Sequence, residues 1–384
     1  MLSETKAAGV SQKQARPLEL APDRHPEPQL NTTMLWCMNA PSPYNADLFR
    51  ELTKHFNLHV SYVNRLLTTT PWASALTLGY RCRFYRRVCG VDFETLNRAI
   101  MNRHSIFLLN VWQDPTTILI VLCRIACRAP FWVWNDTPFR NKNRHPLKAY
   151  LRAVFLRWLL SRADRVLGTG PSATEELQYM GARAARTVNF PYFINPSSYS
   201  VARNINVHRF LSSGRLESIK GYDIALRALA RIKERRKLQF IYEIAGAGSQ
   251  LIPLSQLADS LGLSENVRWL GFLQPQELNC FYSEGGIFLH PARFEPYGVV
   301  ILEAMASGLP VVASKATAAA IDRIRDRKNG YLFETESVED LILVIERMLD
   351  STNLDDVSKA ARLTAEEWPL SRAVEILQTL VAAT

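Results

Sequence analysis

Short apolar runs alternate with amphipathic stretches along most of the 384-residue chain. Five runs in the first half have the length of buried strands: residues 34–39, 58–63, 106–111, 131–134 and 165–168. Four stretches in the same half suit helices: residues 46–55, 116–125, 146–161 and 171–180. Strands that alternate with helices predict a parallel sheet built from βαβ units.

The same alternation returns in the second half. Apolar runs there predict strands at residues 209–213, 242–245, 267–270, 286–290 and 311–313. A helix is expected over residues 299–306, where Gly308 and Pro310 prevent its continuation. A chain of this length, with 47% apolar residues, is expected to form two domains, each with its own core.

The net charge of +10 is concentrated in the first half. Residues 34–195 carry 21 Lys and Arg against 9 Asp and Glu, and basic residues mix with aromatic ones at residues 80–87 and 140–165. Solvated helix faces would explain this pattern, and so would an anionic membrane surface or an anionic acceptor. Nucleic acid is the less favoured partner because no known binding motif occurs.

The patterns of cysteine, histidine and apolar residues bear on the cellular compartment, on metal binding and on membrane insertion. The six cysteines form no C-x-x-C pair, which favours a reducing, cytoplasmic setting. No D-x-D motif and no histidine cluster occurs, so we expect no metal site. No apolar run has the length of a membrane span, and we expect no signal peptide.

The most informative stretch is residues 290–314, which predicts loop, helix and strand in sequence. The first N–H groups of the helix, near Gly298, would form an anion site suited to phosphate. Carboxylates do not bind phosphate, so Glu295 and Glu303 are interpreted as acceptors for hydroxyl groups. Phosphate and two polyols together indicate a nucleotide sugar. A buried helix with two solvated acids is the alternative.

This stretch resembles the E-x7-E signature of glycosyltransferase family 4. The matching residues are Pro291, Glu295, Gly298, Glu303, Ala304, Met305, Ala306, Gly308, Pro310 and Val311 to Ser314. The chain departs from the signature at Pro296, which replaces Gly, and at Tyr297, which replaces Phe. Downstream, Ala318, Ala319 and Asp322 stand where the family often has two glycines and an acid. The resemblance is strong over about residues 205–375 and loose over 34–195.

The resemblance implies a retaining enzyme with the GT-B fold, an α/β architecture of two Rossmann-like domains with parallel sheets facing a central cleft. It implies an acceptor domain at 34–193, a nucleotide-sugar domain at 194–365, and a helix at 366–384 that packs back on the first domain. Four prolines and little periodicity predict a flexible tail at 1–33. Residues 190–197 are the expected linker.

The resemblance also assigns the donor site. The spacing G-R-x-x-x-x-K-G resembles the family's diphosphate clamp and points to Arg215 and Lys220. Glu303 would hold the ribose, Glu295 the donor sugar, and Phe272 and Leu273 the base. The other donor-binding candidates are Gly214, Gly246, Tyr297, Gly298, Val299 and Val300. No metal or other cofactor is then expected.

Candidates on the acceptor side come from the first half. The loop at residues 40–45 resembles that of polysaccharide-forming members of the family, where it lies on the acceptor side. A merely structural turn is the alternative. Asp136 follows a strand in the tetrad at residues 135–138, where it would touch the donor sugar or the acceptor hydroxyl, or act only as a turn residue.

The predicted function is sugar transfer from a nucleotide-diphosphate sugar to a saccharide or lipid-linked saccharide in polysaccharide synthesis. We expect a cytoplasmic protein, peripheral on the inner face of the membrane. An epimerase or hydrolase of the same fold, or a non-catalytic nucleotide-sugar-binding subunit, are the alternatives.

Overall fold

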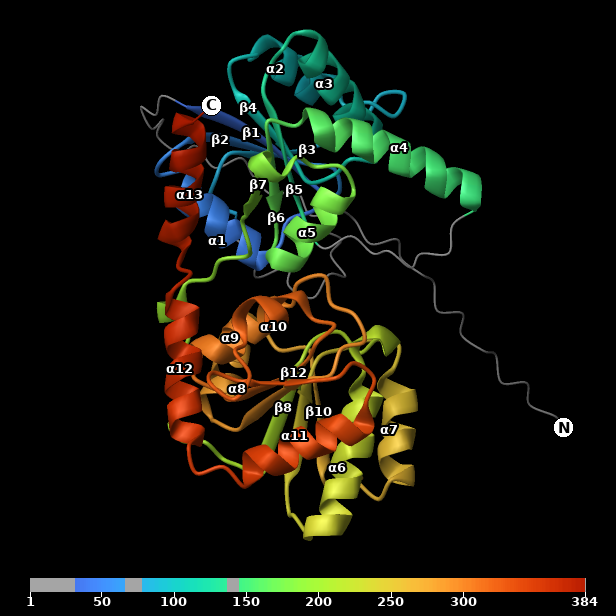
Figure 1. Cartoon of the computed structure of the whole chain (residues 1–384), viewed down its shortest axis with the longest axis vertical. Coiled ribbons are helices and arrows are strands. Elements are labelled where there is room, and N and C mark those ends of the chain that lie inside the picture. Colours follow the sequence, from blue (N-terminus) through green and yellow to red (C-terminus); the bar gives the residue numbers. More distant parts are fainter. Residues whose placement is uncertain (1–31, 66–77, 137–144, 384) are drawn as a thin grey trace, which may run out of the picture.

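The computed structural model describes residues 32–65, 78–136 and 145–383, which form two parallel sheets with helices around them (Figure 1). The first sheet has the order β3-β2-β1-β4-β5-β6-β7, and the second has the order β10-β9-β8-β11-β12-β13. The strands of the first sheet are β1 (Thr33–Met38), β2 (Asn57–Tyr62), β3 (Cys82–Phe84), β4 (Ile106–Leu109), β5 (Phe131–Asn135), β6 (Arg165–Gly168) and β7 (Thr187–Asn189). Those of the second are β8 (Arg209–Ser213), β9 (Ile241–Ala245), β10 (Val267–Gly271), β11 (Ile287–His290), β12 (Val311–Ser314) and β13 (Tyr331–Phe333).

Helices connect successive strands, as parallel pairing requires. The helices of the first domain are α1 (Pro43–Leu52), α2 (Phe93–Met101), α3 (Pro115–Ala126), α4 (Pro146–Arg162) and α5 (Pro171–Tyr179). The second domain contains α6 (Tyr222–Arg236), α7 (Leu251–Ser260), α8 (Pro275–Ser283), α9 (Val299–Ala306), α10 (Ala318–Arg323) and α11 (Val338–Leu349). Two further helices, α12 (Leu354–Glu366) and α13 (Leu370–Ala382), end the chain.

The strand order places the ligand-binding edge of each sheet. It reverses between β1 and β4 in the first sheet and between β8 and β11 in the second. In open parallel sheets, ligands bind beyond the carboxyl ends of the strands at such a reversal. A ligand-binding site is therefore expected at the residues that follow β8 and β11.

The first helix begins earlier than predicted. Helix α1 starts at Pro43 rather than at residue 46, and its N-cap is Ser42. Proline suits this position because its fixed φ is helical and its missing N–H would have no helical partner there.

The end of the chain lies along both domains (Figure 1). Helix α12 contacts α9 of the second domain, and α13 contacts α1 of the first. The prediction of one helix that begins at residue 366 was wrong. Helix α12 ends at Glu366, Pro369 interrupts the helical backbone, and α13 starts at Leu370. Pro369 forms a bridge with Ile194, and the rings of Trp368 and Phe193 are 6.0 Å apart, so the two crossings between domains are packed together.

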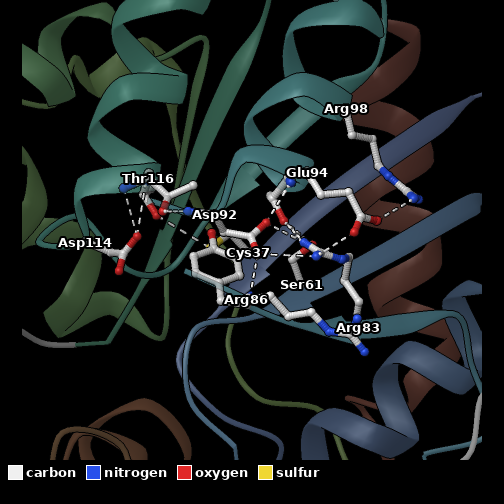
Figure 2. Close-up of polar contacts among 12 residues, drawn as sticks. Cys37, Ser61, Arg83, Arg86, Asp92, Glu94, Arg98, Asp114 and Thr116 are labelled. Atoms are coloured by element: carbon white, nitrogen blue, oxygen red, sulfur yellow. Dashed lines mark hydrogen bonds and ion pairs between the residues drawn. The ribbon is translucent and has the colours of Figure 1, made fainter. Parts of the chain in front are cut away.

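A buried acid organises the basic segment at residues 80–87 (Figure 2). Asp92 caps α2 by accepting a hydrogen bond from the Thr95 N–H at 2.7 Å, and it also accepts from Arg83 and from the Arg86 N–H. Burial alone would raise the pKa of Asp92, but these bonds outweigh it and lower the pKa to about 2. Arg83 thus stabilises the fold through Asp92, and it also forms an ion pair with Glu94 at 2.9 Å.

We expect Asp92→Asn to lower the free energy of unfolding by about 2 kcal/mol at pH 7, because the shifted pKa measures stabilisation of the ionised form. The folded-state pKa is depressed, so this stability is present above the unfolded value of 3.8 and is lost as the pH falls toward about 2. Urea unfolding at several pH values measures it. Glu94→Gln is the matched control, since Glu94 pairs with the same Arg83 but is 60% exposed, and it should cost less than about 0.5 kcal/mol.

No helix among residues 32–65, 78–136 and 145–383 is long and apolar enough to cross a membrane. The expected tail lies almost wholly outside the described residues, as do Arg140, Lys142 and Arg144 of the second basic segment.

Candidate functional site

The turn after β8 and the loop after β11 are held together by Arg293. Its N–H donates to the Ile219 carbonyl at 2.9 Å, and its guanidinium donates to the Ser218 carbonyl at 2.8 Å. The guanidinium also forms two 2.8 Å bonds to the Asp223 carboxylate at the start of α6. Gly221 lies in the turn before Asp223 and has φ +67°. It is so close to the loop after β11 that a Cβ on it would overlap the Pro291 carbonyl. The two segments therefore form one platform.

This platform brings Lys220 and Glu295 into contact. The Lys220 ammonium forms an ion pair with Oε2 of Glu295, and each side chain is only 14% exposed. Nε2 of His290 lies 3.7 Å from the same carboxylate oxygen. Two of the predicted site residues, 75 positions apart in sequence, are thus direct neighbours.

Gly298 forms the start of helix α9. It is the N-cap with φ +96° and ψ 62°, a left-handed conformation that favours glycine. A Cβ at this position would lie 2.9 Å from Cγ2 of Thr317 and 3.0 Å from Cγ of Glu295. Val299 and Val300 follow and are partly exposed. Their N–H groups belong to the first helical turn, where amides lack helical acceptors and attract anions.

Glu303 is held by two tyrosines that the sequence did not single out. It accepts a hydrogen bond from the Tyr282 hydroxyl at 3.1 Å and a second from Tyr199. Burial raises the pKa of Glu303, and the two hydrogen bonds oppose that rise. The hydroxyl of Tyr282 is also 2.7 Å from that of Ser213, at the end of β8. Glu303 therefore sits beside the carboxyl end of β8 and already accepts from hydroxyl groups.

Tyr297 connects the loop after β11 to the first domain. Its hydroxyl donates to Asp322 at 3.0 Å and lies 3.3 Å from a guanidinium nitrogen of Arg323. Its ring packs 5.1 Å from that of Tyr192, which follows β7. Arg323 in turn stacks 4.0 Å from the ring of Trp368. The Tyr297 hydroxyl, which the family's Phe lacks, thus joins the motif to the interdomain crossing.

Asp136 faces this region from the first domain. It accepts a hydrogen bond from the Thr169 hydroxyl at 3.0 Å and another from Tyr192. Burial raises the pKa of Asp136, those bonds oppose the rise, and the charge of Glu295 adds to it. The two carboxyl groups are close enough to interact across the domain boundary. Thr137 and Pro138 of the same tetrad lie outside the described residues.

The glycine turns pack side by side. The Gly214 N–H donates to the Ala245 carbonyl at 2.9 Å, and the Gly246 N–H donates to the Gly271 carbonyl at 2.6 Å. Arg215 is exposed. Hydrogen bonds from Ser249 lower the pKa of Glu217 in the same turn, and the charge of Arg215 helps to lower it. The remaining two candidates follow these turns: Phe272 is 37% exposed and Leu273 is partly buried.

The structure therefore brings only some of the predicted donor residues into contact. Lys220, Glu295 and Gly298 meet at one point, with Tyr297 beside them. Arg215 extends into solvent. Within the described part of the chain, no group of three or more His, Cys, Asp or Glu residues could hold a metal ion.

The second domain matches a known family. Residues 201–364 fit the family model described as glycosyl transferases group 1. This second domain therefore belongs to the group 1 glycosyl transferases. This agrees with the resemblance of the E-x7-E run to glycosyltransferase family 4.

Solved structures with this fold are similar over nearly the whole chain. Anabaena HepE in complex with UDP has a TM-score of 0.76 at 16% identity and covers 92% of this chain and 100% of its own. A HepE complex with UDP-glucose has a TM-score of 0.72 at 17% identity over the same shares. The lipopolysaccharide outer core galactosyltransferase WaaB has a TM-score of 0.67 at 15% identity, with 92% and 99% covered. The α/β prediction of two parallel sheets in the GT-B fold is confirmed.

The first three curated relatives match less than half of the chain. A D-inositol 3-phosphate glycosyltransferase of Corynebacterium aurimucosum is 36% identical over 175 residues, which are 44% of this chain and 41% of the relative. The chain spans under half the length of the first three curated relatives that it matches.

Proposed function

We propose that this protein moves a sugar from a nucleotide-diphosphate sugar to an acceptor hydroxyl, with retention of configuration at the transferred carbon. The contact between Lys220 and Glu295 at the start of α9 carries the proposal. It joins a phosphate-binding cation, a sugar-binding carboxylate and a helix N-terminus at the carboxyl edge of one parallel sheet. UDP-glucose is the donor to test first, because HepE has been crystallised with it.

In this proposal, the charges serve the leaving group. As the bond between sugar and diphosphate loosens, negative charge grows on the phosphate oxygens. Lys220, Arg215 and the first amides of α9 stabilise that charge more strongly in the transition state than in the bound donor. They supply this stabilisation without a metal ion.

The remaining donor-site residues bind neutral groups. Glu303 accepts hydrogen bonds from the ribose hydroxyls in place of the two tyrosines that occupy it here. Glu295 accepts from a hydroxyl of the donor sugar. Phe272 and Leu273 pack against the base, next to the Gly214 and Gly246 turns.

The acceptor enters from the first domain, beside Asp136. That carboxyl group lies within electrostatic reach of Glu295, so a hydroxyl held by Asp136 is near the donor sugar. A phosphate oxygen of the leaving group takes the proton of the acceptor. The raised pKa of Asp136 suits a group that binds a hydroxyl.

Purified protein, UDP-glucose and a panel of saccharide and lipid-linked saccharide acceptors test the function. The expected result is UDP release that depends on acceptor and a glycosidic product with the donor's configuration. Rapid turnover without any acceptor would instead identify a hydrolase or epimerase. Binding without turnover across the panel would identify a non-catalytic subunit.

A membrane-bound acceptor is supported by helix α4. None of the side chains of residues 145–154 is buried, and Figure 1 shows the first turns of α4 extending away from the body of the domain. The helix contains two Arg and one Lys besides its terminal Arg162, and no acid. Its exposed apolar side chains include Leu147, Tyr150, Leu151 and Val154, which are 50–65% exposed. Apolar side chains among cations suit an anionic lipid surface.

We expect Leu147→Asn, Tyr150→Asn and Leu151→Asn together to weaken binding to vesicles of anionic phospholipid by at least about tenfold, because apolar burial and charge both contribute. Vesicle flotation measures this, and added salt should weaken binding by the wild-type protein. The matched control is Leu119→Asn with Leu122→Asn on α3, whose side chains are 38% and 44% exposed. Equal losses in the two variants would contradict a specific role for α4.

A further inference from the structure

His290 contains a buried polar atom that the proposed reaction leaves unused. The residue ends β11 and is only 4% exposed. Its Nε2 has no hydrogen-bond partner among the described residues. A buried group left unpaired costs about 1–3 kcal/mol, so it calls for an explanation. The atom points toward the site, since it lies 3.7 Å from Oε2 of Glu295 and 3.7 Å from where a Cβ on Gly298 would be.

A diphosphate that binds Lys220 would remove the ion-pair partner of Glu295. In the structure, Lys220 forms an ion pair with Oε2 of Glu295, the same oxygen that His290 approaches. A diphosphate needs the ammonium of Lys220 for itself. Once Lys220 turns toward phosphate, a carboxylate that is only 14% exposed loses its charged partner. Such an unpaired charge is costly in a partly buried site.

We propose that His290 replaces Lys220 as the hydrogen-bond donor to Glu295 when the diphosphate of the donor binds. Nε2–H of the imidazole donates to Oε2, which requires the 3.7 Å separation to shorten by about 1 Å. Glu295 thereby stays fixed, and its other oxygen is available to a sugar hydroxyl. The inference rests on the proposed function, because it concerns the same donor site.

The charge state of His290 suits this exchange. Burial lowers the pKa of His290 to about 4, with the charge of Glu295 opposing and that of Lys220 adding to the shift. At neutral pH the ring is uncharged, so it keeps one N–H to donate and does not repel Lys220. A second cation here would compete with Lys220 for the phosphate. A neutral donor holds the carboxylate and leaves the phosphate to Lys220.

Two amide substitutions separate the ring nitrogens. The side-chain amide of His290→Gln reaches the position of Nε2, whereas that of His290→Asn stops near the position of Nδ1. We expect His290→Asn to weaken UDP-glucose binding at least about tenfold and His290→Gln to stay within about threefold of wild type. Titration calorimetry measures both. His208→Asn, at an exposed histidine of the same domain, is the control for a general effect of losing an imidazole. Thermal unfolding of each variant reports whether it folds.

A double-mutant cycle with Glu295→Gln decides whether His290 acts through that carboxylate. In the Glu295→Gln background no charge needs a new partner, so His290→Asn should change UDP-glucose affinity by less than about twofold. A loss that persists at tenfold in that background would overturn the proposal, because His290 would then act on the fold or directly on the donor.

Wild-type binding of UDP-glucose and UDP, measured first, separates the two hypotheses. A wild-type protein that binds neither would overturn the proposed function together with this inference. If wild type and His290→Asn bind UDP-glucose with equal affinity, that result would overturn the inference alone.

Discussion

Lys220→Ala should transfer sugar about 100 times more slowly than wild type, because one charge-assisted hydrogen bond to the leaving phosphate is worth about 1.5–3 kcal/mol. The loss should appear in kcat as well as in kcat/KM, since the charge on the diphosphate is greatest in the transition state. Steady-state rates with UDP-glucose and the best acceptor of the panel measure both. Lys220→Arg should recover little, because a planar guanidinium does not fit the place of a compact ammonium beside Glu295.

Lys315→Ala is the matched control for Lys220→Ala. Lys315 also forms an ion pair with a glutamate, Glu334, and it follows β12 of the same sheet. Its side chain is 44% exposed and that of its partner 63%, so the pair contributes little to stability. Its transfer rate should stay within about twofold of wild type, because an exposed surface pair contributes less than about 1 kcal/mol. Equal rates for Lys220→Ala and the control would remove Lys220 from the diphosphate site and with it the main support of the proposed function.

The sequence indicated the donor site because its residues are close together along the chain. Glu295, Gly298 and Glu303 fall within nine positions, so one loop and one short helix arrange them. Lys220 is distant in sequence, but it lies in the equivalent turn of a preceding βα unit. Parallel strands bring such turns to one edge of the sheet, which is why Lys220 and Glu295 lie near each other.

Residues that reach the site from separate elements carried no such signal. Tyr192 follows β7, Tyr199 lies before β8 and Tyr282 is in α8, yet each contacts a predicted site residue. Tyrosine is common in cores, and only packing shows which hydroxyl faces a carboxylate. His290 was visible in the motif, but its unpaired Nε2 is a property of burial.

Charge patterns were harder to interpret than apolar ones. The basic segment at residues 80–87 suggested a solvated face or a binding surface, but Arg83 and Arg87 pair with the helix-capping acids Asp92 and Asp114. The apolar tract at residues 116–125 suggested a buried helix. Helix α3 instead leaves Leu119 and Leu122 exposed. Arg124 is buried and donates to the carbonyls of Ala99 in α2 and of Pro130 before β5. Net charge and mean hydropathy do not indicate which acid or carbonyl a given arginine contacts in the folded chain.

Gly221→Ala should strongly destabilise the second domain. Gly221 has φ +67° and ψ 22°, and a Cβ there would overlap the backbone carbonyl of Pro291. The left-handed conformation costs an alanine about 1 kcal/mol, and forcing apart packed backbone segments adds about 1–3 kcal/mol. We expect a total loss of about 2–4 kcal/mol in the free energy of unfolding, measured by urea denaturation.

Gly262→Ala isolates the steric part of this effect. Gly262 also has φ +67°, but a Cβ there would meet nothing within 4 Å, so only the conformational cost of about 1 kcal/mol remains. The two variants should also differ in activity. In Gly221→Ala, the turn that carries Lys220 must move away from the loop that carries Glu295, so sugar transfer should fall together with stability. Gly262→Ala should transfer sugar at close to the wild-type rate. The contrary result would be an equal loss of unfolding free energy in both variants, with full activity in Gly221→Ala. It would show that the close approach of the two segments does not position the donor site.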